Sequence, residues 1–213
     1  MTLMSCLRKI VYLAIAIGVS VANAGSFDDF FIAIRNDNTS TLGDLLQRGF
    51  DPNTADERGQ PGLTLAMQEQ SLRAAKLLLE QPGLKIDVLN QAGESALMMA
   101  ALKGEVAGAK MLLARGAKVN QNGWTPLHYA ATGPEPELVR LLLEHGAEVD
   151  ATAPNGTTPL MMAAQYGSED SIKLLLERGA DPNRRNQREL RAADFAKLAG
   201  RDALAARLQK LQR

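Results

Sequence analysis

A pattern of hydrophobic positions recurs along the chain at intervals of about 33 residues. In its clearest copy, residues 123–131 begin with a glycine, end with small apolar residues and are followed by the apolar block Leu141–Leu143. The same order appears over residues 93–113 and 156–176, and in weaker form from Gly59. Each apolar segment suits one short helix, so each copy predicts a helix, a turn and a second helix.

Equivalent alanines give the period of this pattern. They are separated by 33, 34, 30, 33 and 33 residues, and they are Ala33, Ala66, Ala100, Ala130, Ala163 and Ala196. A two-helix unit of this length cannot bury both of its faces, so each copy depends on the next one. The spacing therefore predicts one stacked array of helix pairs.

The best-preserved copy carries a recognisable motif. Residues Thr125–Ala130 match the ankyrin signature T-P-L-H-x-A, and Leu175–Asn183 resemble that family's helix end and the turn that follows. The resemblance covers about residues 27–211 and implies an all-α fold, an α-solenoid of about six ankyrin repeats with β-hairpin fingers between helix pairs. The repeats are expected at about 27–58, 59–92, 93–122, 123–155, 156–188 and 189–211.

The motif residues have local physical roles. Thr125 can cap a helix N-terminus, and Pro126 at the first helical position loses a backbone donor that would have no partner there. The small side chain of Ala130 permits close helix packing. The resemblance implies that His128 braces neighbouring finger turns. The expected structural signature comprises Thr125, Pro126, Leu127, His128 and Ala130, with Pro159 and Leu160 in the next copy.

Some copies depart from the pattern. Only Gln121 and Asn122 separate Asn120 from Gly123, so this finger is shorter by three residues than the next one. Pro134 and Pro136 fall where the turn between two helices is expected. Proline is tolerated at a helix start but not in its middle, so these residues fit that position. The short finger predicts a local bend or notch in the array.

The ends of the array read as caps. A helix is expected from Ser26, with acidic residues in its first turn and an apolar face. The last copy lacks the Thr-Pro start and carries basic residues along its length. A polar outer face is what a terminal repeat needs for solubility.

Composition and charge narrow the function. Aromatic residues make up 4% of the chain, which favours helices packed through Leu, Ala and Met, and the formal net charge is zero. Residues 184–213 are basic, whereas residues 25–183 are acidic. The basic run could touch nucleic acid or lipid headgroups, but it lacks interleaved aromatic residues, so we interpret it as a solvated cap and expect no nucleic-acid partner.

The first 24 residues are typical of a secretory signal peptide. Arg8 and Lys9 precede an apolar run from Ile10 to Val21, and Ala22–Ala24 forms a small-x-small cleavage pattern. The run is short for a membrane span. We therefore expect cleavage after Ala24, a periplasmic or secreted protein without a membrane span, and a mature chain without cysteine, since Cys6 is removed.

Catalytic or metal chemistry is not indicated by any motif. The two histidines, His128 and His145, are far apart in sequence and have structural explanations as a finger brace and a helix end. The sequence contains no G-x-S-x-G elbow, P-loop or G-x-G-x-x-G, so we expect no enzyme, no cofactor and no metal. The methionines of the repeats are expected to fill the core rather than form a flexible binding surface.

The leading functional hypothesis is a monomeric module that binds an unidentified partner protein through the concave face and finger tips that the family resemblance implies. The alternatives are an inhibitor or immunity-type protein that blocks an exported enzyme, and a companion that stabilises one. Fold alone does not choose among them.

Trp124, the only tryptophan in the chain, is the sharpest candidate contact. Its slot holds Gln60, Glu94 and Thr157 in other copies, so we expect it to be exposed. The family resemblance implies that this slot lies on the concave side near Tyr166. Replacing either aromatic residue by alanine is expected to weaken binding with little loss of stability. Alternatively, Trp124 covers the shortened finger. The predicted partner-binding residues are Trp124, Tyr166, Gln165, Thr132, Glu94, Lys103 and Thr157.

Overall fold

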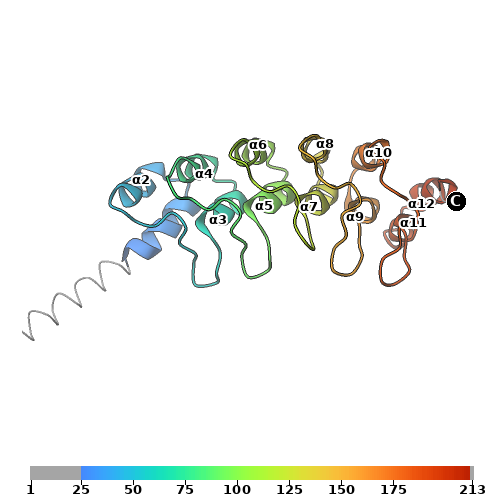
Figure 1. Ribbon diagram of the computed structural model, residues 1–213, viewed down its shortest axis with the longest axis horizontal. Coiled ribbons are helices and arrows are strands. Elements are labelled where there is room, and N and C mark those ends of the chain that lie inside the picture. Colours follow the sequence, from blue (N-terminus) through green and yellow to red (C-terminus); the bar gives the residue numbers. More distant parts are fainter. Residues whose placement is uncertain (1–24, 212–213) are drawn as a thin grey trace, which may run out of the picture.

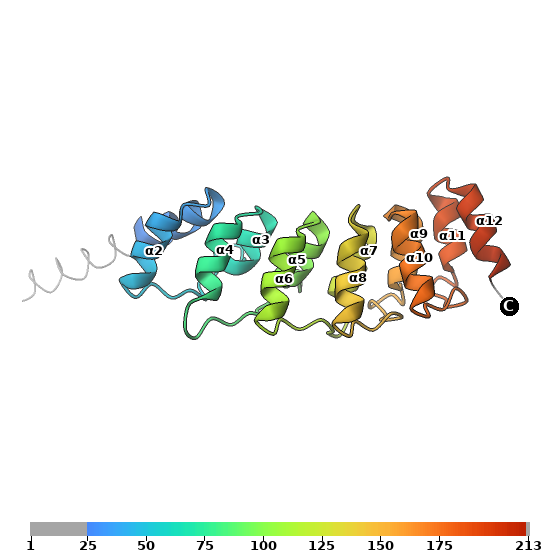
Figure 2. The ribbon, with the colours of Figure 1, turned by 90° about the horizontal axis from the view of Figure 1, so that it is seen from above.

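The computed structural model describes residues 25–211, and over this range the chain forms a single row of helix pairs (Figure 1). Six inner helices lie side by side in one layer. They are the helix of residues 25–35, α3 (Gly62–Gln68), α5 (Ala96–Lys103), α7 (Pro126–Thr132), α9 (Pro159–Tyr166) and α11 (Ala192–Leu198). Six outer helices form the second layer: α2 (Thr39–Gln47), α4 (Leu72–Leu79), α6 (Val106–Ala114), α8 (Pro136–Glu144), α10 (Glu169–Glu177) and α12 (Asp202–Lys210). The predicted all-α solenoid is confirmed, and the axes of α3 to α10 are roughly aligned with one another across the row (Figure 2).

Long loops, here called fingers, leave each outer helix and return to the next inner helix, all projecting to the same side (Figure 1). We call the surface shared by the fingers and the inner helices the concave face. Within the described residues the fingers contain one isolated antiparallel bridge, Ala55 to Pro61, instead of extended strands. They are closed by short backbone turns, such as Gly93 N to Asn90 O at 2.9 Å and Gly156 N to Ala153 O at 2.8 Å.

Close packing of inner helices holds the row together. Neighbouring inner helices contact one another along the whole array, and outer helices contact each other less. The repeated alanines explain this approach, because Ala66, Ala100, Ala130, Ala163 and Ala196 are all buried. Leu127, Leu142 and Leu160 are also fully buried and supply much of the apolar surface between pairs. The core is therefore continuous from one repeat to the next, as stacking requires.

A recurring contact begins several inner helices. The side chain at the third helical position turns back to accept the backbone N–H of the residue before the helix. His128 Nδ1 accepts from Thr125 at 3.1 Å, and Asp194 Oδ2 accepts from Arg191 at 2.8 Å. The sulfur atoms of Met98 and Met161 take the same place at 3.4 Å. Four of the methionines, Met67, Met98, Met99 and Met161, are buried, so core filling is confirmed for them.

Side chains in the loops link each repeat to the next. The side-chain oxygens of Asn53, Asp87, Asn120 and Asp150 each accept a backbone N–H from the following finger. The outer helices end before Gly49, Gly116, Gly146 and Gly179, each with φ between +82° and +89°. Glycine adopts this left-handed conformation without strain.

The finger over residues 117–124 is shorter than its neighbours, which leaves a notch in the row of finger tips (Figure 1). The side chain of Gln121 closes this short loop by donating to the carbonyl of Trp124 at 3.0 Å. Pro136 is the first residue of α8, so the proline is tolerated as expected. The predicted local notch is thus present without a break in the stack.

Different contacts finish the two ends. At the N-terminal end, Phe30 is fully buried and stacks on Phe50 with ring centroids 4.6 Å apart. At the C-terminal end, Arg201 Nη1 donates to the carbonyls of Ala163, Ala164 and Gly167 at 2.9–3.1 Å and so satisfies the end of α9. The predicted signal peptide and the cleavage site at Ala24 lie outside the described residues. Within residues 25–211, no helix has the length and hydrophobicity of a membrane span.

Candidate protein-binding face

A hollow of about 230 Å³ opens on the concave face beside the short finger. It lies between α5, α7 and α9, and its lining is mainly apolar. The lining residues are Leu102, Trp124, His128, Tyr129, Thr132 and Met162. The finger before α7 is shorter than the next one by three residues and ends at Trp124, which lines the hollow. The structure therefore places two features of the sequence, the shortened finger and the single tryptophan, beside the same hollow.

Trp124 is less exposed than the sequence suggested. Its indole is half-buried and meets the ring of His128 edge to face, with centroids 5.2 Å apart. The expectation of an exposed tryptophan among polar neighbours is corrected, because the shortened finger leads Trp124 directly onto the His128 ring. The structural alternative, in which Trp124 covers the short finger, and the binding role are compatible, since the indole also lines the hollow.

His128 is buried and braces two repeats. Its Nδ1 faces the N–H and the hydroxyl of Thr125, and its Nε2 lies 3.0 Å from the carbonyl oxygen of Thr157 in the next finger. This arrangement fits the neutral imidazole that carries its proton on Nε2. Burial lowers the pKa of His128 below its ordinary value, although its backbone hydrogen bonds oppose this shift. The bracing role implied by the family resemblance is present in the geometry.

Tyr129 was missed by the sequence analysis and lines the hollow. Its hydroxyl donates to Glu94 Oε1 at 2.9 Å, and Asn90 donates to the other oxygen of the same carboxylate at 2.9 Å. Burial and the neighbouring Glu94 raise the pKa of Tyr129 well above its usual range. The chain of bonds continues through Gln60 to Gln68. A fixed polar edge therefore borders the apolar hollow on the side of the preceding repeats.

The other predicted contacts divide into accessible and buried residues. Tyr166 is 62% exposed, Lys103 is exposed, and Gln165 and Thr132 are half-buried at the ends of α9 and α7. Thr157 is only 2% exposed and uses its carbonyl to bind His128. We correct the assignment of Thr157, because a side chain buried between two fingers is not accessible to a partner.

Exposed large apolar side chains gather on the concave face. Ile32, Leu102, Tyr166 and Leu198 are 43–65% exposed, and all four lie on inner helices. Leu89 lies on a finger, and Leu211 follows α12 at the end of the chain. Within the described part of the chain, no outer helix carries an exposed large apolar side chain between its first and last residues. Exposed apolar groups gathered mainly on one face are typical of a protein interface.

The described residues offer no cluster of three or more His, Cys, Asp or Glu side chains that could hold a metal ion. The repeated helix pairs and the exposed apolar side chains of the concave face define the class of the protein: a helical repeat protein that presents an extended face to another macromolecule.

The chain belongs to the ankyrin-repeat family. It matches the family described as "Ankyrin repeats (3 copies)" over residues 30–122 and 116–186. Ankyrin repeats mediate protein–protein interaction, and the chain is a module of this kind.

Two relatives illustrate the similarity in sequence. The chain is 38% identical over 127 residues to an ankyrin repeat-containing protein of Treponema pallidum (strain Nichols), covering 57% of this chain and 42% of that protein. It is 32% identical over 114 residues to the B-cell lymphoma 3 protein homolog of Mus musculus, covering 50% of this chain and 25% of that one. The chain thus spans less than half the length of these curated relatives.

A solved structure gives a similarity that covers more of both chains. The structure titled "Bd0816 Predatory Endopeptidase from Bdellovibrio bacteriovorus in complex with immunity protein Bd3460" contains a chain that superposes with a TM-score of 0.75. The two chains are 27% identical, and the match covers 85% of this chain and 97% of the other one.

Proposed function

We propose that the protein binds a partner protein on its concave face, around the hollow beside the short finger, and that it is not an enzyme. The observation that carries this proposal is the placement of the exposed large apolar side chains of the described residues: four of the six lie on inner helices, and none lies along an outer helix. The hollow offers a recess for one apolar side chain, and Tyr166 and Leu102 add flanking apolar surface. Aromatic residues of this kind dominate the energetics of interfaces.

The fixed polar edge beside the hollow supports the same site. Glu94 is held by Tyr129 and Asn90, so the carboxylate keeps its position before a partner arrives. A preorganised group loses little conformational entropy on binding. We expect Glu94, Lys103, Thr132 and Gln165 to contribute polar contacts around the apolar centre.

We further propose that the partner is an enzyme exported from the same cell and that binding blocks it, as an immunity-type protein would. The match to a chain of the solved endopeptidase–immunity protein complex supports this candidate, because it covers nearly all of that chain. The expected signal peptide agrees with such a location, in the periplasm or outside the cell. We expect the protein to act as a monomer, without nucleic acid.

The experiment is affinity capture from the cell envelope. The full chain is expressed in its own cells with a C-terminal tag, and proteins retained with it are identified by mass spectrometry. Tyr166→Ala should lose the partner, whereas Leu211→Ala, which removes an exposed apolar side chain off the concave face, should retain it. Equal retention by both variants, or no specific partner, would refute the proposed face.

A second measurement separates the possible effects on the partner. The captured enzyme is assayed with increasing amounts of the purified protein. Loss of activity that is complete at one equivalent supports the immunity-type function. A longer half-life of the partner at undiminished activity would instead indicate a stabilising companion.

A further inference from the structure

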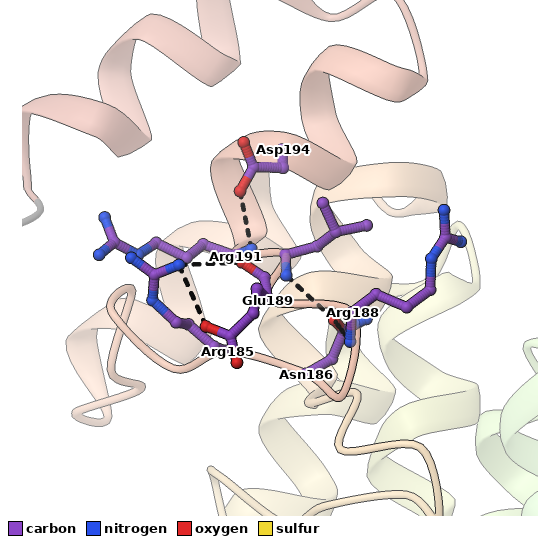
Figure 3. A network of polar contacts seen from close by, with 7 residues as sticks. Arg185, Asn186, Arg188, Glu189, Arg191 and Asp194 are labelled. Carbon is purple, nitrogen blue, oxygen red and sulfur yellow. Dashed lines mark hydrogen bonds and ion pairs between the residues drawn. The ribbon is translucent and has the colours of Figure 1, made fainter.

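The last finger, residues 184–191, is held rigidly (Figure 3). The side chain of Asn186 is buried, and its oxygen accepts the N–H groups of Arg188 and Leu190 at 2.9 and 3.1 Å. Gln187 ties this finger to the preceding one, since its side chain donates to Pro154 O at 2.7 Å and its backbone N–H donates to Asn155 O at 2.9 Å. The tip therefore has a defined shape before any partner binds.

This finger carries a charge opposite to that of the other full-length fingers. Arg184, Arg185 and Arg188 are exposed on it, against the single acid Glu189. In the fingers over residues 51–59, 87–94 and 150–157, acidic residues outnumber basic ones. The positive charge is thus local to one end of the concave face.

Two arginines of the last finger differ, since Arg185 is fixed and Arg188 is free to bind. Arg185 Nη1 lies 3.2 Å from the carbonyl oxygen of Glu189 and 3.4 Å from its carboxylate. The Arg188 side chain extends away from this network (Figure 3), and its guanidinium forms no ion pair with any residue in the described range. Arg188 can therefore offer its planar donor groups to an external carboxylate, which it matches in a bidentate way.

Glu189 occupies an unfavourable backbone position. It stands where the other fingers have Gly59, Gly93, Gly123 and Gly156, and it has a φ of +59°. A residue with a side chain is strained in this region, and such strain is concentrated at functional sites. Here the strained residue positions Arg185 through both its carbonyl and its carboxylate.

We propose that the last finger recognises an acidic segment of the partner protein, with Arg188 and Arg185 binding its carboxylates. The inference rests on the proposed function and adds the chemistry of the partner. A protein segment fits better than an extended polyanion, because the acidic fingers along the same face repel a nucleic acid or an anionic membrane surface. The finger also lacks the aromatic side chains on which bases stack.

The test uses a fluorescein-labelled peptide of glutamates and measures its fluorescence anisotropy with the purified protein at low ionic strength. Arg188→Glu should bind the peptide about tenfold more weakly than the unaltered protein does. Added salt should weaken peptide binding by the unaltered protein. The matched control is Arg115→Glu, which reverses another exposed arginine whose side chain forms no ion pair within the described residues and should leave binding unchanged. Thermal melting of each variant shows that the fold is retained.

Glu189→Gly provides a second variant that removes the strain and releases Arg185. It should melt at the same or a higher temperature and bind the peptide about threefold more tightly, because the only acidic side chain of this finger no longer pairs with Arg185. Equal binding by the unaltered protein, Arg188→Glu and Arg115→Glu would overturn the proposal, as would no peptide binding at all. Binding to vesicles of anionic phospholipid that requires Arg188, without peptide binding, would replace the acidic segment by a membrane surface.

The capture experiment, repeated with Arg188→Glu, distinguishes this inference from the proposed function. If no protein is retained by the unaltered chain, the proposed function fails whatever the peptide does. If a partner is retained equally by the unaltered chain and by Arg188→Glu, the function stands and the role of the last finger is refuted.

Discussion

Tyr166 and Trp124 share the concave face but are held differently. Tyr166 is 62% exposed at the end of α9, so replacing it should barely alter packing. We predict that Tyr166→Ala weakens partner binding by about 2 kcal/mol and leaves the melting temperature nearly unchanged. Titration calorimetry with the captured partner and thermal melting measure the two effects. An unchanged affinity would remove Tyr166 from the interface.

Trp124 should report on both stability and binding, because its ring packs against His128. Trp124→Ala is therefore expected to lower the melting temperature more than Tyr166→Ala does, since it uncovers the start of α7. Trp124→Phe keeps an aromatic ring over His128 and serves as the control for packing. If Trp124→Ala lowers stability with no separate loss of affinity, Trp124 has only a structural role.

His128 should make stability depend on pH. Its pKa lies below the ordinary value of 6.5 because burial disfavours the charged imidazole. Below about pH 6.5 the unfolded chain takes up a proton that the folded chain does not bind. The free energy of unfolding is therefore unaffected by this group above that pH and falls as the pH decreases below it.

The slope for one such proton approaches about 1.4 kcal/mol per pH unit. In His128→Gln, which keeps a hydrogen-bonding side chain without titrating, this part of the slope should disappear. Urea denaturation of both proteins between about pH 5 and 7.5 gives the comparison. Parallel curves for the two proteins would show that His128 does not supply the slope.

At the level of the helices, stability depends on the surface between neighbouring pairs. Leu142 of α8 is fully buried, so Leu142→Ala should lower the free energy of unfolding by about 2–5 kcal/mol through the cavity that it leaves. Lys173 of α10 has a side chain that is 73% exposed and lies 3.8 Å from Glu177. Lys173→Ala should cost less than about 0.5 kcal/mol. Similar losses in denaturant titrations of both variants would contradict this division.

The helix pairs could be predicted from the sequence because their signals are local. The Thr-Pro start before Leu127, the small Ala130 and the glycine after most outer helices all act within a few residues. The shortened finger could also be predicted, because it has three fewer residues than the next finger. The candidate site was predicted less well, since its contacts join separate repeats.

Tyr129 illustrates this limit. Its partner Glu94 lies 35 positions earlier, and the same slot holds Met99 or Met162 in neighbouring copies. Thr157 was misassigned because sequence does not show which finger residue turns inward to meet His128. The strained Glu189 is likewise visible only as a backbone angle, although its place in the glycine register could have drawn attention to it.

At the scale of the whole molecule, export determines which residues the mature protein contains when it meets a partner. The expected signal peptide predicts that the exported protein begins at Gly25. N-terminal sequencing of protein purified from the envelope or the medium checks this result. A mature protein that keeps Met1, or one found only in the cytosol, would contradict it.

Arg201 has a consequence for how the array opens. A terminal helix pair has a neighbour on one side only, so the ends of a repeat array fray first and exchange their amide hydrogens fastest. The guanidinium of Arg201 joins this last pair to three carbonyls at the end of α9. Opening of α12 should therefore be coupled to opening of the preceding repeat. In Arg201→Met, amide hydrogens of α12 should exchange faster while those of α6 keep their protection, so that fraying becomes confined to the last repeat.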